Sequence, residues 1–284
     1  MIWQTSRYQI SLDQPRVMGI VNVTPDSFSD GGKFYSPGRG QRAAFAHCEQ
    51  LLKDGADILD IGGESSRPGA PLVPLDEELS RVLPVVRHAV RLGVPVSVDT
   101  CKPELMQAVL DLGVDIINDI WALRQPGAAA VVAAHATCGV CLMHMHREPQ
   151  SMQLVPMAGD VLPQVLSFLR QVSSQLQAIG VHADRIVLDP GIGFGKTVAQ
   201  NFTLLARQRE LLAAGYPLLL GWSRKSSLAA VSANSLARVA QLDSMDRMVP
   251  SVTAAVLAVE RGARVVRVHD VRETVQALKV WAAA

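Results

Sequence analysis

Eight short apolar runs, each ending in a polar residue or a glycine-rich turn, alternate with segments of helix length along the chain. Strands that alternate with helices favour parallel pairing, and eight strand–helix units are the number that closes a barrel. We therefore expect an α/β fold, a single (β/α)8 TIM barrel over residues 1–284, with a doubly wound open sheet as the alternative. The runs cover residues 16–22, 57–65, 95–99, 115–119, 139–144, 185–191, 217–225 and 264–270.

A hairpin, two long loops and a set of helices complete the expected barrel. Residues 1–14 alternate and turn, which predicts an N-terminal β-hairpin that caps the barrel floor. Residues 24–39 and 64–74 follow the first and second runs, and they are rich in Gly, Ser and Pro. Long loops in a compact domain are usually functional, so we expect two mobile loops over one active site. Helices are expected over residues 41–53, 102–112, 127–136, 155–179, 201–213, 248–262 and 270–282.

The composition argues against several classes of protein. Hydrophobic residues make up 49% and charged residues 19% of the 284 residues, which is enough for a large core. A net charge of +1 gives no reason to expect a nucleic acid or an anionic membrane as partner. The first residues contain no apolar signal-peptide segment, and no stretch approaches the roughly 20 apolar residues of a membrane span. We expect a cytoplasmic protein.

The four cysteines include one Cys-x-x-Cys pair, Cys138 and Cys141. This pair enters an apolar strand, whereas redox pairs open a helix whose N-terminus lowers the thiol pKa. His135 and His144 extend the pair to a possible zinc set, but the four residues cross a helix-to-strand junction and should not converge on one metal ion. We expect small buried residues here, with a redox or zinc site as the alternatives.

Residues 191–197, Gly-Ile-Gly-Phe-Gly-Lys-Thr, resemble the end of a phosphate-binding loop. The first glycine that this motif requires is replaced by Pro190, so the match fails. A dinucleotide-binding turn is also excluded, because several strand–helix units precede this one. We interpret the segment as a glycine loop that brings the backbone close to a flat ligand, with Phe194 as a lid.

Three polar residues, Asp99, Asn118 and Asp189, end apolar strands on the rim where barrel enzymes carry their active sites. A single aspartate of this kind has a structural alternative as a helix N-cap. Three together favour a ligand, because burying a carboxylate without a partner is costly. A carboxylate that accepts two parallel N–H groups, beside an amide, suits a 2-amino-4-oxo heterocycle, and Lys225 can donate to its ring.

A second set of residues on the same rim is suited to an anion. Arg67, Arg267 and His269 can meet the amide of Asn22 near the start of a helix at Asp270. Arginine binds phosphate oxygens through two N–H groups, and a helix N-terminus adds backbone donors. An amide oxygen shared with phosphate oxygens and water suits Mg²⁺. The sequence therefore predicts a heterocycle pocket beside a diphosphate pocket, although a solvent-exposed loop position is the alternative for Arg67.

Eight motifs, in order along nearly the whole chain, resemble those of the bacterial dihydropteroate synthases. The resemblance implies a reaction in which 4-aminobenzoate displaces pyrophosphate from 6-hydroxymethyl-7,8-dihydropterin diphosphate to form 7,8-dihydropteroate for folate synthesis. It also implies a homodimer and a bound Mg²⁺. The motifs are residues 22–32, 60–70, 97–100, 117–120, 143–145, 189–196, 223–226 and 267–271.

The resemblance also implies a role for individual residues. The residues expected to bind the pterin are Asp99, Asn118, Met143, Asp189, Phe194, Gly221 and Lys225. Those expected to face the diphosphate are Asn22, Ser66, Arg67, Arg267 and His269, with Asn22 also the Mg²⁺ ligand. Those expected to shape the aminobenzoate pocket are Phe28, Pro68 and Ser226. The catalytic residues are expected to be Asp99, Lys225 and Arg67.

Three positions depart from the usual family pattern. Ser66 replaces a threonine, Gln200 replaces a frequent histidine, and Trp222 stands where a smaller residue is common. The last of these puts the shape of the pocket wall beside Lys225 in doubt. Two other functions compete: a pterin-binding barrel of the methyltetrahydrofolate–corrinoid methyltransferase type, and a catalytically silent paralogue that binds pterin and modulates a partner.

Overall fold

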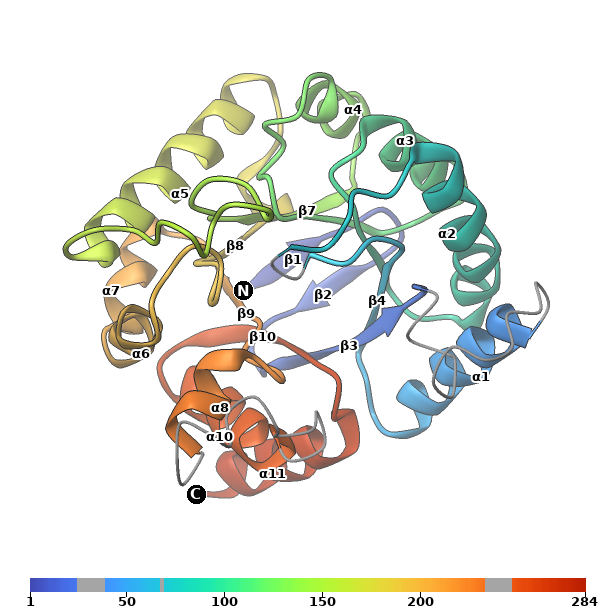
Figure 1. The fold of residues 1–284 in the computed structure, drawn as a ribbon. Coiled ribbons are helices and arrows are strands. Elements are labelled where there is room, and N and C mark those ends of the chain that lie inside the picture. The colour runs from blue at the N-terminus through green and yellow to red at the C-terminus, as the bar shows by residue number, and fades with distance from the viewer. Residues whose placement is uncertain (25–38, 67–68, 233–246) are drawn as a thin grey trace.

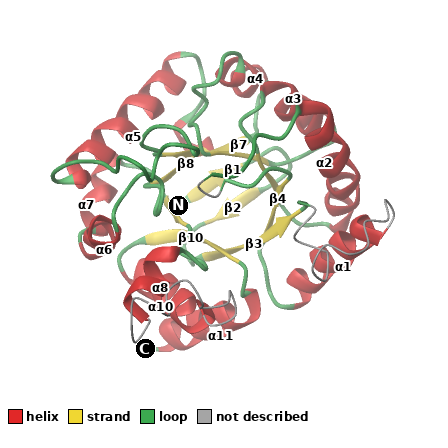
Figure 2. Cartoon of the chain, in the orientation of Figure 1, coloured by secondary structure: helices red, strands yellow, loops and turns green. Residues whose placement is uncertain are grey.

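A closed barrel of eight parallel strands stands inside a ring of helices (Figures 1 and 2). The computed structural model describes residues 1–24, 39–66, 69–232 and 247–284. The order of strands around the barrel is β10-β3-β4-β5-β6-β7-β8-β9, so the predicted TIM barrel is confirmed and the open sheet is wrong. The strands are β3 (Arg16–Asn22), β4 (Ile58–Gly62), β5 (Val96–Asp99), β6 (Ile116–Asp119), β7 (Gly139–Met143), β8 (Ile186–Asp189), β9 (Leu218–Leu220) and β10 (Ala263–Val268).

The helices bury their apolar faces against the outside of the barrel, as their amphipathic sequences require. Within the described residues, no helix is both long enough and apolar enough to cross a membrane. The helices are α1 (Arg39–Lys53), α2 (Leu75–Ala89), α3 (Pro103–Asp111), α4 (Ala128–Ala134), α5 (Val161–Ala178), α6 (Val198–Ala206), α7 (Gln208–Leu211), α8 (Ser226–Ser232), α10 (Met248–Glu260) and α11 (Val271–Ala283).

The predicted N-terminal hairpin is present and closes one end of the barrel. Strands β1 (Ile2–Gln4) and β2 (Gln9–Ser11) pair antiparallel, and the hairpin lies within the ring of helices in Figure 2. Trp3 is fully buried, and its indole N–H donates to the carbonyl oxygen of Arg185 at 2.9 Å. With Ile10 and Leu12 it packs on the apolar side chains that point inward from seven strands: Met18, Ile58, Ile116, Cys141, Val187, Leu219 and Val265.

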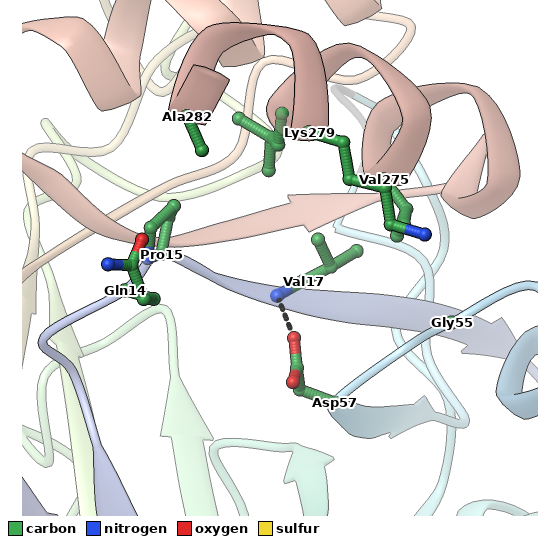
Figure 3. A pocket seen from close by; sticks show the side chains of 9 residues that line it. Gln14, Pro15, Val17, Gly55, Asp57, Val275, Lys279 and Ala282 are labelled. Atoms are coloured by element: carbon green, nitrogen blue, oxygen red, sulfur yellow. Dashed lines mark hydrogen bonds between the residues drawn. The ribbon is translucent and has the colours of Figure 1, made fainter.

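A shallow groove of about 240 Å³ opens at this floor end, between the start of β3 and the last turns of α11 (Figure 3). Val17 and Asp57 line it from the strand side, and the Asp57 carboxylate accepts the Val17 N–H at 2.8 Å. Lys279 and Ala282 line it from α11. Because it lies at the N-terminal ends of the strands, the groove is distant from the polar rim that the sequence singles out.

Only part of each loop that we expect to be mobile belongs to the described residues. Residues 25–38 of the first loop and residues 67–68 of the second lie outside them. The mobility of both loops therefore stays a prediction. The described residues of the second loop, 64–66 and 69–74, lie after the end of β4 and before the start of α2.

Candidate active site

The inward-pointing residues at the C-terminal ends of the strands form a polar rim. Alternation along each strand places every second side chain inside the barrel. In register, Asp99 at the end of β5 lies opposite Asn118 on β6, and Met143 at the end of β7 lies opposite Asp189 on β8. Asn118, Met143 and Asp189 are buried. The predicted pterin residues of these four strands therefore share one end of the barrel.

An ion-pair network joins β10, β4 and β5 across the barrel mouth. The Arg267 guanidinium on β10 donates from Nε to Asp60 Oδ2 at 2.6 Å and from Nη2 to Asp99 Oδ2 at 2.9 Å. The Asn118 amide approaches the same Asp60 carboxylate at 3.4 Å. Arg267 and Asp99, which we assigned to separate pockets, are thus direct partners, and the two pockets share a wall.

Asp60 carries this network, but the sequence analysis assigned it no role. A signal was present, because Asp60 is the one carboxylate between the apolar residues of the segment 58–61, and it is fully buried. A buried carboxylate needs a positive partner. Which residue is that partner depends on the closure of the barrel, because closure places β10 next to β3, which pairs with β4. That partner, Arg267, is 207 residues away in the sequence.

Burial and charge together set the ionisation of the mouth. Burial raises the pKa of the Asp99 carboxyl above its ordinary value, although the Arg267 charge opposes that shift. Burial also raises the pKa of Asp189, against the opposing N–H of Gly191. For Arg267, burial alone would lower the pKa, but Asp60 and Asp99 raise it above its ordinary value. The guanidinium therefore stays charged and favours the anionic form of Asp99.

An apolar cluster covers one side of the mouth. Phe194, from the loop after β8, packs with Met143, Met145 and Met152 in this cluster. The Lys225 ammonium lies 4.3 Å from the centroid of the Phe194 ring. Phe194 and Lys225 are therefore adjacent, as expected for two residues that line one slot.

The glycine loop of residues 191–195 was expected to bring its backbone close to a flat ligand. Two of its three glycines instead let the loop pack on a neighbouring segment of the protein. All three glycines have positive φ angles, of 69°, 83° and 71°. A Cβ at Gly191 would lie 1.8 Å from the carbonyl oxygen of His144, and one at Gly195 would lie 2.6 Å from the Cβ of His146. These two glycines let the loop pack on the segment after β7, whereas Gly193 faces the Lys225 side chain.

Lys196 ends this loop and turns into the protein, which the sequence analysis did not predict. Its ammonium donates to the Gly191 and Phe194 carbonyl oxygens at 2.8 and 3.2 Å and lies 2.9 Å from His144 Nδ1. Burial lowers the pKa of Lys196 to about 7 and that of His144 to about 2, so His144 is a neutral acceptor. Lys196 therefore holds the loop that carries Phe194, and it does not act as a phosphate-loop lysine.

The expected diphosphate residues that the structure describes lie on the ends of three strands. Asn22 ends β3 and is half-buried, and Ser66 follows the end of β4. His269 follows β10, and its Nδ1 lies 2.9 Å from the Ser223 hydroxyl, which also accepts the His269 N–H at 3.1 Å. The helix expected near Asp270 begins at Val271. Arg67 lies outside the described residues.

The remaining predicted positions are only partly described. Ser226 is exposed and is the first residue of α8, whereas Phe28 and Pro68 lie outside the described residues. A Cβ on Gly221 would have a single neighbour within 4 Å, the Cβ of Arg267, so Gly221 keeps the mouth open beside the arginine. The aminobenzoate set therefore stays a prediction.

Two of the departures from the family pattern have a structural explanation. The Trp222 side chain is buried in the layer between barrel and helices, 5.3 Å from the Phe202 ring. Its bulk is thus accommodated away from the mouth. Gln200 forms a capping box with Thr197 at the start of α6.

The cysteine and zinc alternatives are not supported. All four cysteines are free, and burial raises the pKa of both Cys138 and Cys141. His135 Nδ1 accepts the backbone N–H of Cys138, whereas His144 contacts Lys196. No group of three or more His, Cys, Asp or Glu residues suited to a metal ion occurs in the described part of the chain.

Comparisons with known proteins agree with this geometry. The family model described as "Pterin binding enzyme" matches residues 18–269. A dihydropteroate synthase of Neisseria meningitidis serogroup C is 48% identical over 284 residues, which cover 99% of this chain and 97% of the relative. A solved dihydropteroate synthase of Xanthomonas albilineans with 4-aminobenzoic acid has a TM-score of 0.89 at 45% identity and covers 100% of this chain and 98% of its own.

A second solved structure contains 7,8-dihydropteroate. The dihydropteroate synthase of Burkholderia cenocepacia, complexed with 7,8-dihydropteroate, has a TM-score of 0.86 at 45% identity, with 99% of this chain and 95% of its own covered. The family model, the sequence relatives and the structures agree along almost the whole length. The chain therefore belongs to the dihydropteroate synthases, which are transferases within the family of pterin-binding enzymes.

Proposed function

We propose that the chain joins 6-hydroxymethyl-7,8-dihydropterin diphosphate to 4-aminobenzoate, releasing pyrophosphate and forming 7,8-dihydropteroate for folate biosynthesis. The observation that carries the proposal is the polar set at the barrel mouth, where Arg267 binds Asp60 and Asp99, and where Asn118 and Asp189 are buried. The solved relatives with 4-aminobenzoic acid and with 7,8-dihydropteroate support the choice of substrates.

The proposed pterin site depends on hydrogen-bond acceptors that have no protein donor among the described residues. Asp189 accepts the Gly191 N–H through Oδ1 at 2.7 Å, and its Oδ2 has no protein donor among the described residues. In a buried site, a carboxylate oxygen of this kind binds an N–H donor strongly. We assign it to the amino and ring N–H groups of the pterin, with Asn118 beside it. Phe194 and Met143 would form the wall of the slot, and Lys225 would donate to the ring.

The diphosphate half is assigned to Asn22, Ser66, Arg67, Arg267 and His269. Asn22 offers one hard oxygen donor at the end of β3, which suits Mg²⁺ because this ion keeps several waters and binds substrate phosphates with few protein ligands. The residues present thus fit a metal ion that arrives with the diphosphate, and Asn22 would hold it. When bound, Mg²⁺ would neutralise charge on the leaving pyrophosphate.

We propose that the C–O bond breaks well ahead of attack by the amine. The electron-rich dihydropterin can carry positive charge on its exocyclic carbon, and the Asp99 carboxylate would stabilise that charge electrostatically. The Arg267 charge, 2.9 Å from Asp99, favours the anionic form of this carboxyl against the effect of burial. The aromatic amine of 4-aminobenzoate is neutral at pH 7, so no strong general base is required. Loop closure would exclude water from the cation.

The other expectations remain proposals. Phe28, Pro68 and Ser226 are proposed to shape the aminobenzoate pocket, and Lys225, Asp99 and Arg67 to be catalytic. The homodimer is proposed from the family resemblance, and the cytoplasmic location from the composition of the chain. Analytical ultracentrifugation of the purified chain tests the dimer, and cell fractionation tests the location.

The deciding experiment is pyrophosphate release by the purified chain, with pterin diphosphate, Mg²⁺ and 4-aminobenzoate each omitted in turn. We expect release together with dihydropteroate only in the complete mixture. Pterin binding without product would indicate the silent paralogue instead. Asp189→Asn should abolish pterin binding, whereas Asp184→Asn, at an exposed aspartate near the floor, should have no effect. Unchanged binding by the Asp189 variant would overturn the proposed pterin grip.

A further inference from the structure

A cluster of three charged side chains, one buried and two half-buried, lies where the chain leaves β4 toward the proposed diphosphate side. The Lys102 ammonium donates to Glu64 Oε2 and to Glu78 Oε2. Glu64 directly follows the end of β4, Glu78 lies in the first turn of α2, and Lys102 is the N-cap residue of α3. One lysine therefore joins three segments that surround the barrel mouth.

The backbone beside the cluster is tightly packed. A Cβ at Gly63 would lie 2.6 Å from Val82 Cγ2 and 2.8 Å from Glu78 Cγ, so only glycine fits there. Arg81 of α2 donates to the Gly63 carbonyl oxygen at 2.9 Å. Helix α2 thus presses directly on the end of β4, and the next side chain, that of Glu64, is directed to Lys102.

The cluster depends on the lysine charge. The Glu78 side chain is 1% exposed, and within the described residues its Oε1 has no hydrogen-bond partner. Burial raises the pKa of the Glu78 carboxyl, and Lys102 opposes this shift. Without the ammonium, Glu64 and Glu78 would be two carboxylates at the same point, and like charges in a buried site repel strongly. Glu64, the more exposed of the two, would then move away.

We propose that Lys102 is a positioning residue that sets the diphosphate side of the active site through Glu64. Ser66, assigned to the diphosphate, is two residues after Glu64, and Asp99, assigned to the pterin, is three residues before Lys102. The Lys102–Glu64 contact therefore fixes the spacing between the two halves. This inference rests on the proposed function and adds a residue to which the family resemblance gave no role.

The test compares two ligands that differ only in the diphosphate. Isothermal titration in the presence of Mg²⁺ measures binding of 6-hydroxymethyl-7,8-dihydropterin diphosphate and of the alcohol 6-hydroxymethyl-7,8-dihydropterin to the full chain. For Lys102→Met we expect affinity for the diphosphate to fall about tenfold, with affinity for the alcohol within twofold of the wild type. Lys102→Arg should recover most of the loss, because it restores the charge. Lys53→Met, at an exposed lysine of α1, is the matched control and should change neither.

The possible outcomes separate the two claims. If the wild type binds neither ligand, the proposed function is wrong. If the wild type binds both and Lys102→Met binds both equally well, the positioning role is wrong. An equal loss of both affinities would also overturn it, because that result indicates general damage to the fold. Should Lys102→Met fail to fold, Glu64→Gln tests the same contact, and we expect a smaller loss confined to the diphosphate ligand.

Discussion

The barrel holds an arginine–carboxylate pair at each end, and the two pairs differ in how fully their hydrogen bonds are satisfied. At the floor, Arg7 binds Asp115 through Nη2 at 2.6 Å and also donates to the Val90 and Val94 carbonyl oxygens. The Asp115 carboxylate accepts the Val96 N–H at 2.8 Å and the Arg7 N–H at 3.0 Å. Each guanidinium nitrogen of Arg7 thus donates within the protein, and each oxygen of Asp115 accepts at least two N–H groups.

At the mouth, a single guanidinium serves two carboxylates. Arg267 donates one N–H group to Asp60 and one to Asp99, and its Nη1 has no protein acceptor within the described residues. Neither Asp60 nor Asp99 accepts a backbone N–H from the described residues. The floor pair therefore has nothing left to offer a ligand, whereas the mouth network keeps donors and acceptors for one. Both ends of the barrel contain charged side chains. The mouth differs from the floor because some of its hydrogen-bond donors and acceptors have no protein partner among the described residues.

The largest expected effect is that of Arg267→Met. Removing the guanidinium leaves Asp60 and Asp99 buried and facing each other, and it removes a donor proposed for the diphosphate. We expect kcat/KM to fall by about a thousandfold, on the order of 4 kcal/mol of transition-state stabilisation. Steady-state measurement of pyrophosphate release checks this value. A loss below tenfold would contradict a functional role for the network. The kcat/KM of Arg267→Lys should lie between that of the wild type and that of Arg267→Met.

Arg7→Met tests the other end of the barrel. Although Arg7 is itself partly exposed, its removal leaves the fully buried Asp115 carboxylate without a cation, which costs about 3 kcal/mol of stability. We expect that loss in the free energy of unfolding measured with urea, with kcat/KM of the folded enzyme within twofold of the wild type. If activity fell in proportion to stability, the separation of scaffold from site would be wrong.

The sequence predicted the rim well because its signals are local. A strand that ends in a carboxylate or amide is visible in a single run of residues, so Asp99, Asn118 and Asp189 were identified before the fold was known. Asp60 and Lys196 were missed because their roles depend on partners, Arg267 and a neighbouring loop, that only the closed barrel brings near.

Helix boundaries were predicted less well. Helical spacing placed one start at residue 155, but α5 begins at Val161, where Asp160 caps the helix by accepting the Leu162 N–H. The start of α6 was placed at residue 201, although the capping box of Thr197 and Gln200 sets it at Val198. That second boundary was readable, because Thr-x-x-Gln is a known helix-start pattern. No helix was predicted over Leu75–Ala89, which contains Pro84.

Trp3→Phe tests the floor without touching a charge. Phenylalanine fills most of the indole volume but lacks the N–H that binds the buried Arg185 carbonyl oxygen at 2.9 Å. An acceptor left without a donor, together with a small cavity, should cost about 2 kcal/mol. Thermal and urea unfolding measure this loss, and catalytic constants should not change. A stability equal to that of the wild type would show that the hairpin contributes little to closing the barrel.

The smallest expected effect is a change with pH in the free energy of unfolding, and it arises at the C-terminal end of β6. Asp119 ends this strand, is fully buried, and accepts the Trp121 and Leu123 N–H groups at 2.8 and 2.7 Å. Burial raises the pKa of Asp119 from 3.8 to about 7, although these two N–H groups oppose the shift. The folded state therefore binds more protons than the unfolded state between these values, and stability must fall as pH rises through this window.

Asp119→Asn removes this dependence. The amide cannot accept both N–H groups, so the variant should be less stable at every pH, and only the change between two pH values isolates the ionisation. Between pH 5 and pH 7 we expect the wild type to lose on the order of 1 kcal/mol more than the variant in urea unfolding. Asp184→Asn, at an exposed carboxyl, is the control and should follow the wild type. Parallel curves for wild type and Asp119→Asn would mean that the two N–H groups stabilise the Asp119 anion enough to cancel the cost of burial.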